Sequence, residues 1–409
     1  MAFSPLGVMS SLLSITDGGM ILFWTGACAY TARQIERDAP LNYPLLGLII
    51  LFGALFKWPI YVLWLLIIGA WGVFPRLISW RIVLGVAISL LGLLPSIYWN
   101  ASHDWVTFRH VWATLAGGHA PKPSGATNAG NFLEYLGAQA LLVSPILFIL
   151  FLVGVWELRF AKNLKPRPKG VIFCGLVSMV ILGTALILSL FMKMQGNWGI
   201  FAYPTAFVVI GWYACQIKTS AKKWLLGGIV LSVILCGIVF SIPYLQSNSI
   251  QIGGKYLPYK LNPFRHNMGW DRLEGELKNA GYNPEHDFLF GDKYQTASIL
   301  SFYGEAQKRA YFLNLSAMRK NQFSFWPGIE KEQKGKRGFF IVTENASKLT
   351  TETAEITSRY QKLLQPYFEQ VHFLGMKPLF YANGEVAKGA FIFECIGYSG
   401  EVPVDPHLY

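Results

Sequence analysis

Charged and polar side chains at the ends of long apolar segments are the residues of this chain that could do chemistry. Asp17 comes immediately before the first of these segments, in the stretch 14–19. A carboxylate there could form part of an active-site rim beside a membrane. Thr16 or Asp17 could equally cap the free backbone N–H groups of a helix. The two interpretations are compatible, because a capping carboxylate can still face a cavity.

Lys57 stands between two apolar segments, in the sequence Lys57-Trp58-Pro59. A lysine in hydrocarbon costs at least about 2.5 kcal/mol, so its ammonium must reach the membrane interface, a polar cavity or an anion. One interpretation is that the side chain extends along apolar surface to reach water. The other is contact with the phosphate of a lipid, which suits a compact ammonium.

Polar residues are densest in the segment 95–108, which ends one apolar run and opens a long loop. Trp99 and Trp105 fit the belt of aromatic side chains found where membrane meets water. His103 and Asp104 could transfer a proton or contact a diphosphate, or could simply solvate the loop.

A second polar cluster, Gln195-Gly196-Asn197-Trp198, precedes another apolar run. Asn197 could cap a helix over 199–217, or its amide could hydrogen-bond a sugar.

These residues need apolar elements to position them, and the composition supplies such elements. Of the 409 residues, 53% are hydrophobic and only 14% are charged, against about 25% charged in a typical soluble domain. The composition changes near residue 245. Before that point, eight apolar segments of roughly membrane-spanning length alternate with short polar loops. They cover 18–33, 44–56, 58–74, 82–99, 131–156, 170–191, 199–217 and 224–244.

The net charge of +12 predicts membrane topology rather than a nucleic-acid partner. Residues 1–245 carry 16 Lys and Arg against 6 Asp and Glu, so most of the excess lies in the apolar half. With eight spans, twelve of these cations fall in one set of loops and four in the other. The four are Lys57, Arg109, Lys122 and Lys193. The twelve are Arg33, Arg37, Arg76, Arg81, Arg159, Lys162, Lys165, Arg167, Lys169, Lys218, Lys222 and Lys223. Because short cytoplasmic loops collect Lys and Arg, both chain ends and the polar residues above are expected outside the cytoplasm.

Residues 246–409 are expected to form a soluble α/β domain on that same non-cytoplasmic side, with 1–245 as the transmembrane domain. Strands are predicted at 287–291, 309–313, 338–342 and 390–396, and helices at 295–303 and 351–367. The sequence contains neither a nucleotide-binding glycine motif nor zinc-ligand spacing, so it predicts no metal site.

Several short stretches, in this order and spacing, resemble bacterial membrane glycosyltransferases of the GT-C type. These form the broad family 39 group related to protein mannosyltransferases and the lipid A aminoarabinose transferase. The matching stretches are Thr16-Asp17, Gly53 to Lys57, Pro95 to Phe108 with its Trp99-Asn100 and His103-Asp104-Trp105 core, Gln195 to Trp198, Ala202 to Pro204, Gly269 to Leu273, Asp292 to Ala297, Phe302-Tyr303 and Asn321 to Gly328.

The resemblance implies a polytopic inverting transferase in the bacterial inner membrane. Such enzymes take a sugar from a polyprenyl-phosphate carrier and pass it to a lipid, glycan or protein acceptor on the periplasmic face, as in building lipopolysaccharide or other envelope glycans. An outer-loop carboxylate acts as general base, and cations or a divalent metal offset the charge on the departing phosphate.

Applied to this chain, the resemblance places Asp17, His103 and Asp104 in catalytic roles. Lys57 would contact the carrier phosphate. Trp99, Asn100, Asn197 and Trp198 would contact sugar or acceptor.

The family pattern also includes a first span and a large outer loop with an acidic pair, for which this sequence offers no counterpart. Its principal base therefore maps to no residue here. Three explanations stand open: a truncated or wrongly started reading frame, a separately encoded N-terminal fragment, and a non-catalytic remnant. The alternative to an enzyme is a membrane protein that only binds a lipid-linked glycan or a partner. A transporter is less favoured, because acidic residues are absent from the middle of the predicted spans.

Overall fold

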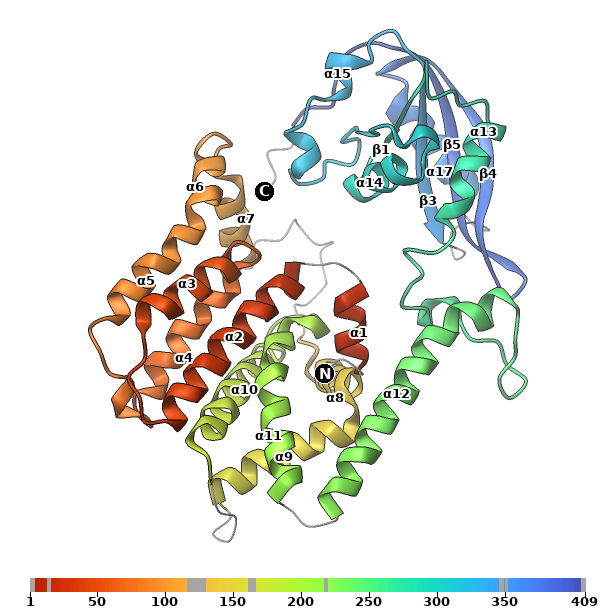
Figure 1. Ribbon diagram of the computed structural model, residues 1–409. Helices are drawn as coiled ribbons and strands as arrows, with labels where there is room; N and C mark the ends of the chain where they lie inside the picture. The colour runs from red at the N-terminus through yellow and green to blue at the C-terminus, as the bar shows by residue number, and fades with distance from the viewer. Residues whose placement is uncertain are drawn as a thin grey trace. The chain divides into compact units, whose positions relative to one another are not determined.

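The computed structural model describes residues 4–12, 16–115, 130–160, 167–216, 220–345, 349 and 352–405 (Figure 1). The chain divides into two compact units. The first comprises residues 1–105 and 119–239, and the second comprises 106–118 and 240–409. Each unit is described by itself.

All regular secondary structure described in the first unit is helical. Its helices are α1 (Pro5–Leu12), α2 (Thr16–Glu36), α3 (Tyr43–Ala54), η1 (Trp58–Tyr61), α4 (Val62–Ala70), η2 (Pro75–Leu77), α5 (Ile82–Leu90), η3 (Leu91–Leu93), α6 (Leu94–Ala101), α8 (Phe132–Val143), α9 (Pro145–Phe160), α10 (Lys169–Leu188), η4 (Gly196–Ala202), α11 (Tyr203–Gln216) and most of α12 (Ser220–Ser247). All eight predicted apolar segments are therefore helical, as expected.

Within the described part of the chain, four helical stretches are long and apolar enough to cross a membrane: Ile82–Ala101, Lys169–Leu188, Gly196–Gln216 and Ser220–Ser247. The helices Tyr43–Ala54 and Trp58–Ala70 are apolar but shorter. With such helices, the chain has the character of a membrane protein. Of the basic residues used to predict the topology, Lys122, Lys162, Lys165 and Lys218 lie outside the described residues.

The candidate span predicted over 131–156 is not one continuous helix. The structure has two helices there, α8 and α9, bent by 100° relative to each other, and they count as a fifth candidate span only if taken together. Ser144 occupies the bend with φ 99° and ψ 129°. The next residue, Pro145, begins α9, a position that proline favours because it has no N–H to leave unpaired.

One hydrophobic core holds the first unit together, and α2, α3, α10 and α11 contribute to it. Helix α2 packs against both α3 and α10, which in turn packs against α11. Trp24, Tyr43 and Phe173 are fully buried at these interfaces. This packing fixes the start of α2 relative to the end of α3, where two of the predicted site residues lie.

The second unit is built on a mixed five-stranded sheet with the order β2-β1-β3-β5-β4. The strands are β1 (Phe288–Gly291), β2 (Tyr311–Phe312), β3 (Gly338–Asn345), β4 (Phe368–Ala382) and β5 (Glu385–Tyr398). Strand β1 pairs in parallel with β2 and β3, whereas β5 is antiparallel to β3 and β4. The unit's helices are α7 (Val106–Leu115), α13 (Leu273–Asn279), α14 (Tyr294–Tyr303), α15 (Ile329–Glu332) and α17 (Thr353–Leu364), with 3-10 turns η5 (Tyr259–Leu261), η6 (Trp270–Arg272), η7 (Glu305–Gln307) and η8 (Gln322–Ser324).

Alternating strand residues give this sheet two apolar faces, each covered by helices (Figure 1). On one face, Phe340 and Phe393 pack with Tyr360 of α17. On the other, Phe339 and Ile392 belong to a cluster that includes residues of α13 and α14. The three layers confirm the predicted α/β character of the C-terminal region, and each predicted strand and helix has a counterpart.

Strand β4 is the element that the sequence pattern missed. Its ladder with β5 is irregular near Gly375 and Pro378, where the register shifts. These residues interrupt the alternation by which a strand is recognised. A hairpin signal was nevertheless present: Asn383-Gly384 joins the two strands with φ values of 57° and 83°, as a two-residue hairpin turn requires.

Two cationic side chains of this unit bond to buried groups: Arg337, whose own side chain is 37% exposed, and Lys388, which is itself buried. Arg337 donates Nε and Nη2 to the buried carboxylate of Asp287 at 2.9 and 2.7 Å, and these bonds raise the pKa of the guanidinium. Lys388 is 4% exposed, and its ammonium contacts the carbonyl oxygens of His266 and Met268, both at 3.1 Å. Its Nζ lies 3.8 Å from the centre of the Trp270 ring. Desolvation lowers the pKa of Lys388 to about 7.

Candidate active site

Asp17 lies in the first turn of α2 and is only 6% exposed. A negative charge is favourable there, because the N-terminal end of a helix carries partial positive charge. Thr16, the other predicted cap, is the first helical residue, so the capping position itself lies outside the described residues. The carboxylate of Asp17 is instead engaged by a side chain from another element.

Lys57 follows α3 in extended conformation, with φ −161° and ψ 132°, and its backbone N–H donates to the carbonyl of Gly53 at 3.1 Å. Two glycines allow this turn to approach α2. A β-carbon on Gly19 of α2 would lie 2.2 Å from the Phe56 ring, and one on Gly53 would lie 2.1 Å from Ile60 and 3.0 Å from Cβ of Phe23 in α2. Because larger residues would clash at both places, these glycines let the head of the α3–η1 connection reach the start of α2.

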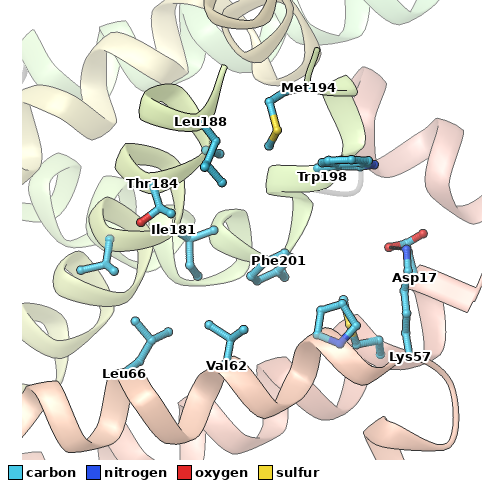
Figure 2. Close-up of a pocket in the computed structure, with 14 residues that line it drawn as sticks. Asp17, Lys57, Val62, Leu66, Ile181, Thr184, Leu188, Met194, Trp198 and Phe201 are labelled. Carbon is cyan, nitrogen blue, oxygen red and sulfur yellow. Dashed lines mark hydrogen bonds and ion pairs between the residues drawn. The ribbon is translucent and has the colours of Figure 1, made fainter. Parts of the chain in front are cut away.

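Lys57 and Asp17 form an ion pair across 40 residues of sequence. The distance from Nζ to Oδ1 is 2.8 Å (Figure 2). The Asp17 side chain is 8% exposed and the Lys57 side chain 37%. The carboxylate therefore depends on this lysine for compensation, whereas the ammonium keeps access to polar surroundings.

The pair lies at one side of a cavity of about 470 Å³ whose other walls are largely apolar. Leu66, Ile181 and Leu188 line the part away from the pair, as Figure 2 shows. The remaining lining residues are Met20, Pro59, Val62, Val180, Thr184, Ala185, Met194, Trp198 and Phe201. A cavity of this construction suits a ligand with a charged head and a long hydrocarbon tail.

Trp198, one of the predicted contacts, lines this cavity from η4. Buried polar side chains of α8 hold the backbone around it. Gln139 donates to the carbonyl of Gly196 at 2.8 Å and accepts from the hydroxyl of Tyr203 at 2.7 Å. Just before α8, Asn131 bonds both the N–H and the carbonyl of Met194, at 2.8 and 3.0 Å.

Asn197 sits beside Trp198 inside η4, and it is not among the residues that line the cavity. Gln195 occupies the N-cap of η4, and α11 begins only at Tyr203. The interpretation of Asn197 as a helix cap is therefore wrong, because a 3-10 turn precedes the α-helix.

The other predicted site residues lie on α6 and the turn after it, and none of them lines the cavity. The ring of His103 stacks on Trp99 with 4.1 Å between centroids, and its Nδ1 lies 2.7 Å from the Trp99 carbonyl oxygen. Asn100 is buried and donates to the carbonyl of Ser96 at 2.8 Å.

Asp104 is exposed, and both it and Trp105 have positive φ, 53° and 56°. Such a backbone is costly for a bulky residue like tryptophan. The structure therefore brings together Asp17, Lys57 and Trp198, whereas Trp99, Asn100, His103 and Asp104 form a separate group.

Sequence reasoning missed the residues that shape the cavity without being charged. Thr184, Met194 and Phe201 come from α10, η4 and the connection between them. No local signal distinguishes such side chains from ordinary core residues of an apolar helix. Gln139 could have been noticed as an amide within a predicted span, where a polar side chain needs a partner.

Among the described residues there is no group of three or more His, Cys, Asp or Glu side chains that could hold a metal ion.

Two curated proteins are similar to this chain. One is the lipid A galacturonosyltransferase RgtD of Rhizobium johnstonii, 25% identical over 371 residues, which covers 87% of this chain and 72% of the relative. The other is the lipopolysaccharide core galacturonosyltransferase RgtB of the same organism, 24% identical over 200 residues, which covers 47% of this chain and 39% of the relative.

Both relatives are named as transferases that modify lipid A or the lipopolysaccharide core. No protein-family model matches the chain, and no solved structure matches it either. The names of both relatives agree with the glycosyltransferase activity expected from the sequence.

Proposed function

We propose that this chain is a membrane glycosyltransferase that moves a sugar from a polyprenyl-phosphate carrier to a lipid or glycan acceptor of the lipopolysaccharide type. The observation that carries the proposal is the Asp17–Lys57 pair at one side of an apolar cavity. The names of the two relatives supply the reaction class and the kind of acceptor.

The cavity matches the two parts of such a donor. Its apolar side chains, including Val62, Leu66 and Ile181, would receive the isoprenoid chain. The ammonium of Lys57 would meet the phosphate, for which a compact cation is suited. In the free protein the Asp17 carboxylate is hydrogen-bonded to the Lys57 ammonium, in the position that a phosphate oxygen would take.

Donor binding would then change the state of both residues. Once Lys57 contacts the phosphate, the Asp17 carboxylate is released to accept a proton from the acceptor hydroxyl or to orient that hydroxyl. The hydroxyl oxygen forms a bond to the anomeric carbon as the bond from that carbon to the phosphate oxygen breaks. The departing phosphate keeps the electron pair, and the lysine offsets its charge.

We further propose the topology that accompanies this function. Residues 1–245 would cross the bacterial inner membrane eight times, and 246–409 would form a periplasmic domain. Twelve cations in one set of loops and four in the other support that arrangement. Reporter fusions that placed Lys57 and His103 in the cytoplasm would contradict it.

Transfer by purified protein tests the proposal. The full chain in lipid nanodiscs would be supplied with a polyprenyl-phosphate sugar and lipid A, and glycosylated lipid A would be measured by mass spectrometry. Asp17→Asn and Lys57→Met are expected to lower the rate at least 100-fold, the scale of a lost proton acceptor or charge stabiliser.

Asp38→Asn is the matched control. Asp38 also forms an ion pair, with Lys169, but it lines a different cavity. Its transfer rate should equal that of the wild type. Donor binding without any transfer would favour the non-catalytic alternative. Equal rates for all three variants would refute the assignment of the site.

A further inference from the structure

The segment Asn321 to Gly328 was singled out in the sequence, and the proposed reaction assigns it no role. In the structure it borders a cavity of about 220 Å³ in the second unit. Phe323 and Trp326 line the cavity, and their rings meet edge to face with 5.0 Å between centroids. Trp326 is 45% exposed, so part of its ring is open to the solvent.

The walls of this cavity are held in place by local hydrogen bonds. Asn321 caps η8 by accepting from the N–H of Phe323 at 3.0 Å. Asn314 braces the preceding loop by bonding the N–H and carbonyl of Met318, at 2.7 and 2.8 Å. The guanidinium of Arg309 lies 5.5 Å from the centre of the Trp326 ring. The aromatic surface is therefore supported from within the protein and presented to the solvent.

A carboxylate already occupies the cationic side of the cavity. Lys320 is largely buried, with 18% of its side chain exposed, and its Nζ lies 2.8 Å from Oδ2 of Asp405. Asp405 comes from the segment 402–405 near the end of the chain, and this whole segment lines the cavity. Glu330 adds a second carboxylate to the lining.

These features define the chemistry of a ligand. An exposed tryptophan offers an apolar face to the C–H side of a sugar ring, and the carboxylate of Glu330 can accept hydrogen bonds from sugar hydroxyls. Lys320 can bind a carboxylate, because its ammonium is already paired with that of Asp405. The volume is below the roughly 300–1,000 Å³ of sites for drug-sized ligands, so it suits one ring rather than a chain of several.

We propose that this cavity, lined by Lys320, Phe323, Trp326 and Glu330, binds a single acidic sugar ring. When no sugar is bound, Lys320 forms its ion pair with Asp405 instead. A role in reading an acidic sugar of the acceptor rests on the proposed function. The binding itself does not, because the residues involved are separate from the Asp17–Lys57 cavity.

Ligand-observed NMR on the full chain in phospholipid nanodiscs tests the binding, since these contain no competing sugar headgroup. The probes are D-galacturonate and D-galactose at equal concentration. Saturation transfer to galacturonate should exceed transfer to galactose. Lys320→Gln should abolish that preference, and Trp326→Ala should remove binding of both sugars.

Asp405→Asn separates the proposal from a loss of folding, because it is expected to strengthen binding. Removing a competing exposed carboxylate should lower the Kd for galacturonate about two- to fivefold, the scale of one exposed ion pair. Glu285→Gln is the matched control. It removes the carboxylate from the Lys308–Glu285 pair, which lies 3.0 Å apart and outside this cavity, and it should leave the Kd unchanged.

Two further outcomes distinguish the proposed sugar site from the Asp17–Lys57 site. Galacturonate binding that persists in Lys57→Met, together with lost transfer, would support a separate site. Equal binding of the two sugars, or an unchanged Kd in Asp405→Asn, would overturn the proposal while leaving the proposed transferase activity untouched.

Discussion

The unequal burial of the Asp17–Lys57 pair predicts that its two partners differ in their effect on stability. Lys57→Met leaves a carboxylate that is 6% exposed without its compensating charge. An unsatisfied buried group costs about 1–3 kcal/mol, so we expect a loss of about 2 kcal/mol. Asp17→Asn leaves an ammonium on a side chain that is 37% exposed. Since that ammonium can be solvated, the expected loss is about 0–1 kcal/mol.

Thermal unfolding of the purified chain, followed by tryptophan fluorescence in one detergent, measures the difference. A loss of 1 kcal/mol lowers Tm by about 2–4 °C for a domain of 150–250 residues. Lys57→Met should therefore melt about 4–8 °C below the wild type. The double variant Asp17→Asn/Lys57→Met should recover most of that loss, because the buried negative charge is gone.

The Asp38–Lys169 pair provides the comparison, because both of its side chains are about half exposed. Lys169→Met should have the same Tm as the wild type. If Asp17→Asn lowered Tm as much as Lys57→Met, or if the double variant were the least stable of the three, the reasoning from burial would be refuted.

Three further predictions concern buried polar groups elsewhere. Gln139→Leu removes the two hydrogen bonds of its amide, to the Gly196 carbonyl and from the Tyr203 hydroxyl. It should raise the KM for the donor and lower the Tm by several degrees, whereas Tyr203→Phe, which removes only one of these bonds, should have a smaller effect. In the wild type, the free energy of unfolding should rise by up to about 1.4 kcal/mol per pH unit between pH 7 and 9 because of Lys388. Lys388→Met should abolish this rise. The folded pKa, about 7, lies below the unfolded value of 10.5, so the unfolded state binds more protons throughout that window and stability rises with pH. Comparing the Tm of variant and wild type at pH 7, 8 and 9 tests it. Arg337→Leu should destabilise the second unit by about 2–3 kcal/mol, seen as faster hydrogen exchange in β3, because Asp287 is then buried without its cation.

Long apolar runs were sufficient to predict most helices of the first unit, although not α1 or the breaks within the segments. The eight segments all proved helical, since long apolar runs between polar loops leave few alternatives. The break at Ser144 was missed although Pro145 marks it, because a proline within an apolar run is also compatible with a kinked single helix. Strand β4 was missed because Gly375 and Pro378 disrupt its alternation.

The site was predictable only one residue at a time. Asp17 and Lys57 were each conspicuous as charges beside apolar segments. Their pairing depends on the close approach at Gly19 and Gly53, which is a property of helix packing and leaves no trace in local sequence. Trp198 was predicted through its polar neighbours. The resemblance placed His103 in a catalytic role together with Asp17, but an expected position on the same side of the membrane does not specify that two residues lie close together.

The irregular β4 strand also bears on how readily another chain could pair with the edge of this sheet. The sheet ends in β2, which has two residues, and in β4, whose ladder is interrupted near Gly375 and Pro378. A strand that lacks an N–H at one position and bulges at others is a poor template for another chain to pair with. The residues that made β4 hard to recognise in the sequence thus also disfavour pairing at that edge, and at the other edge β2 is too short to offer a long template.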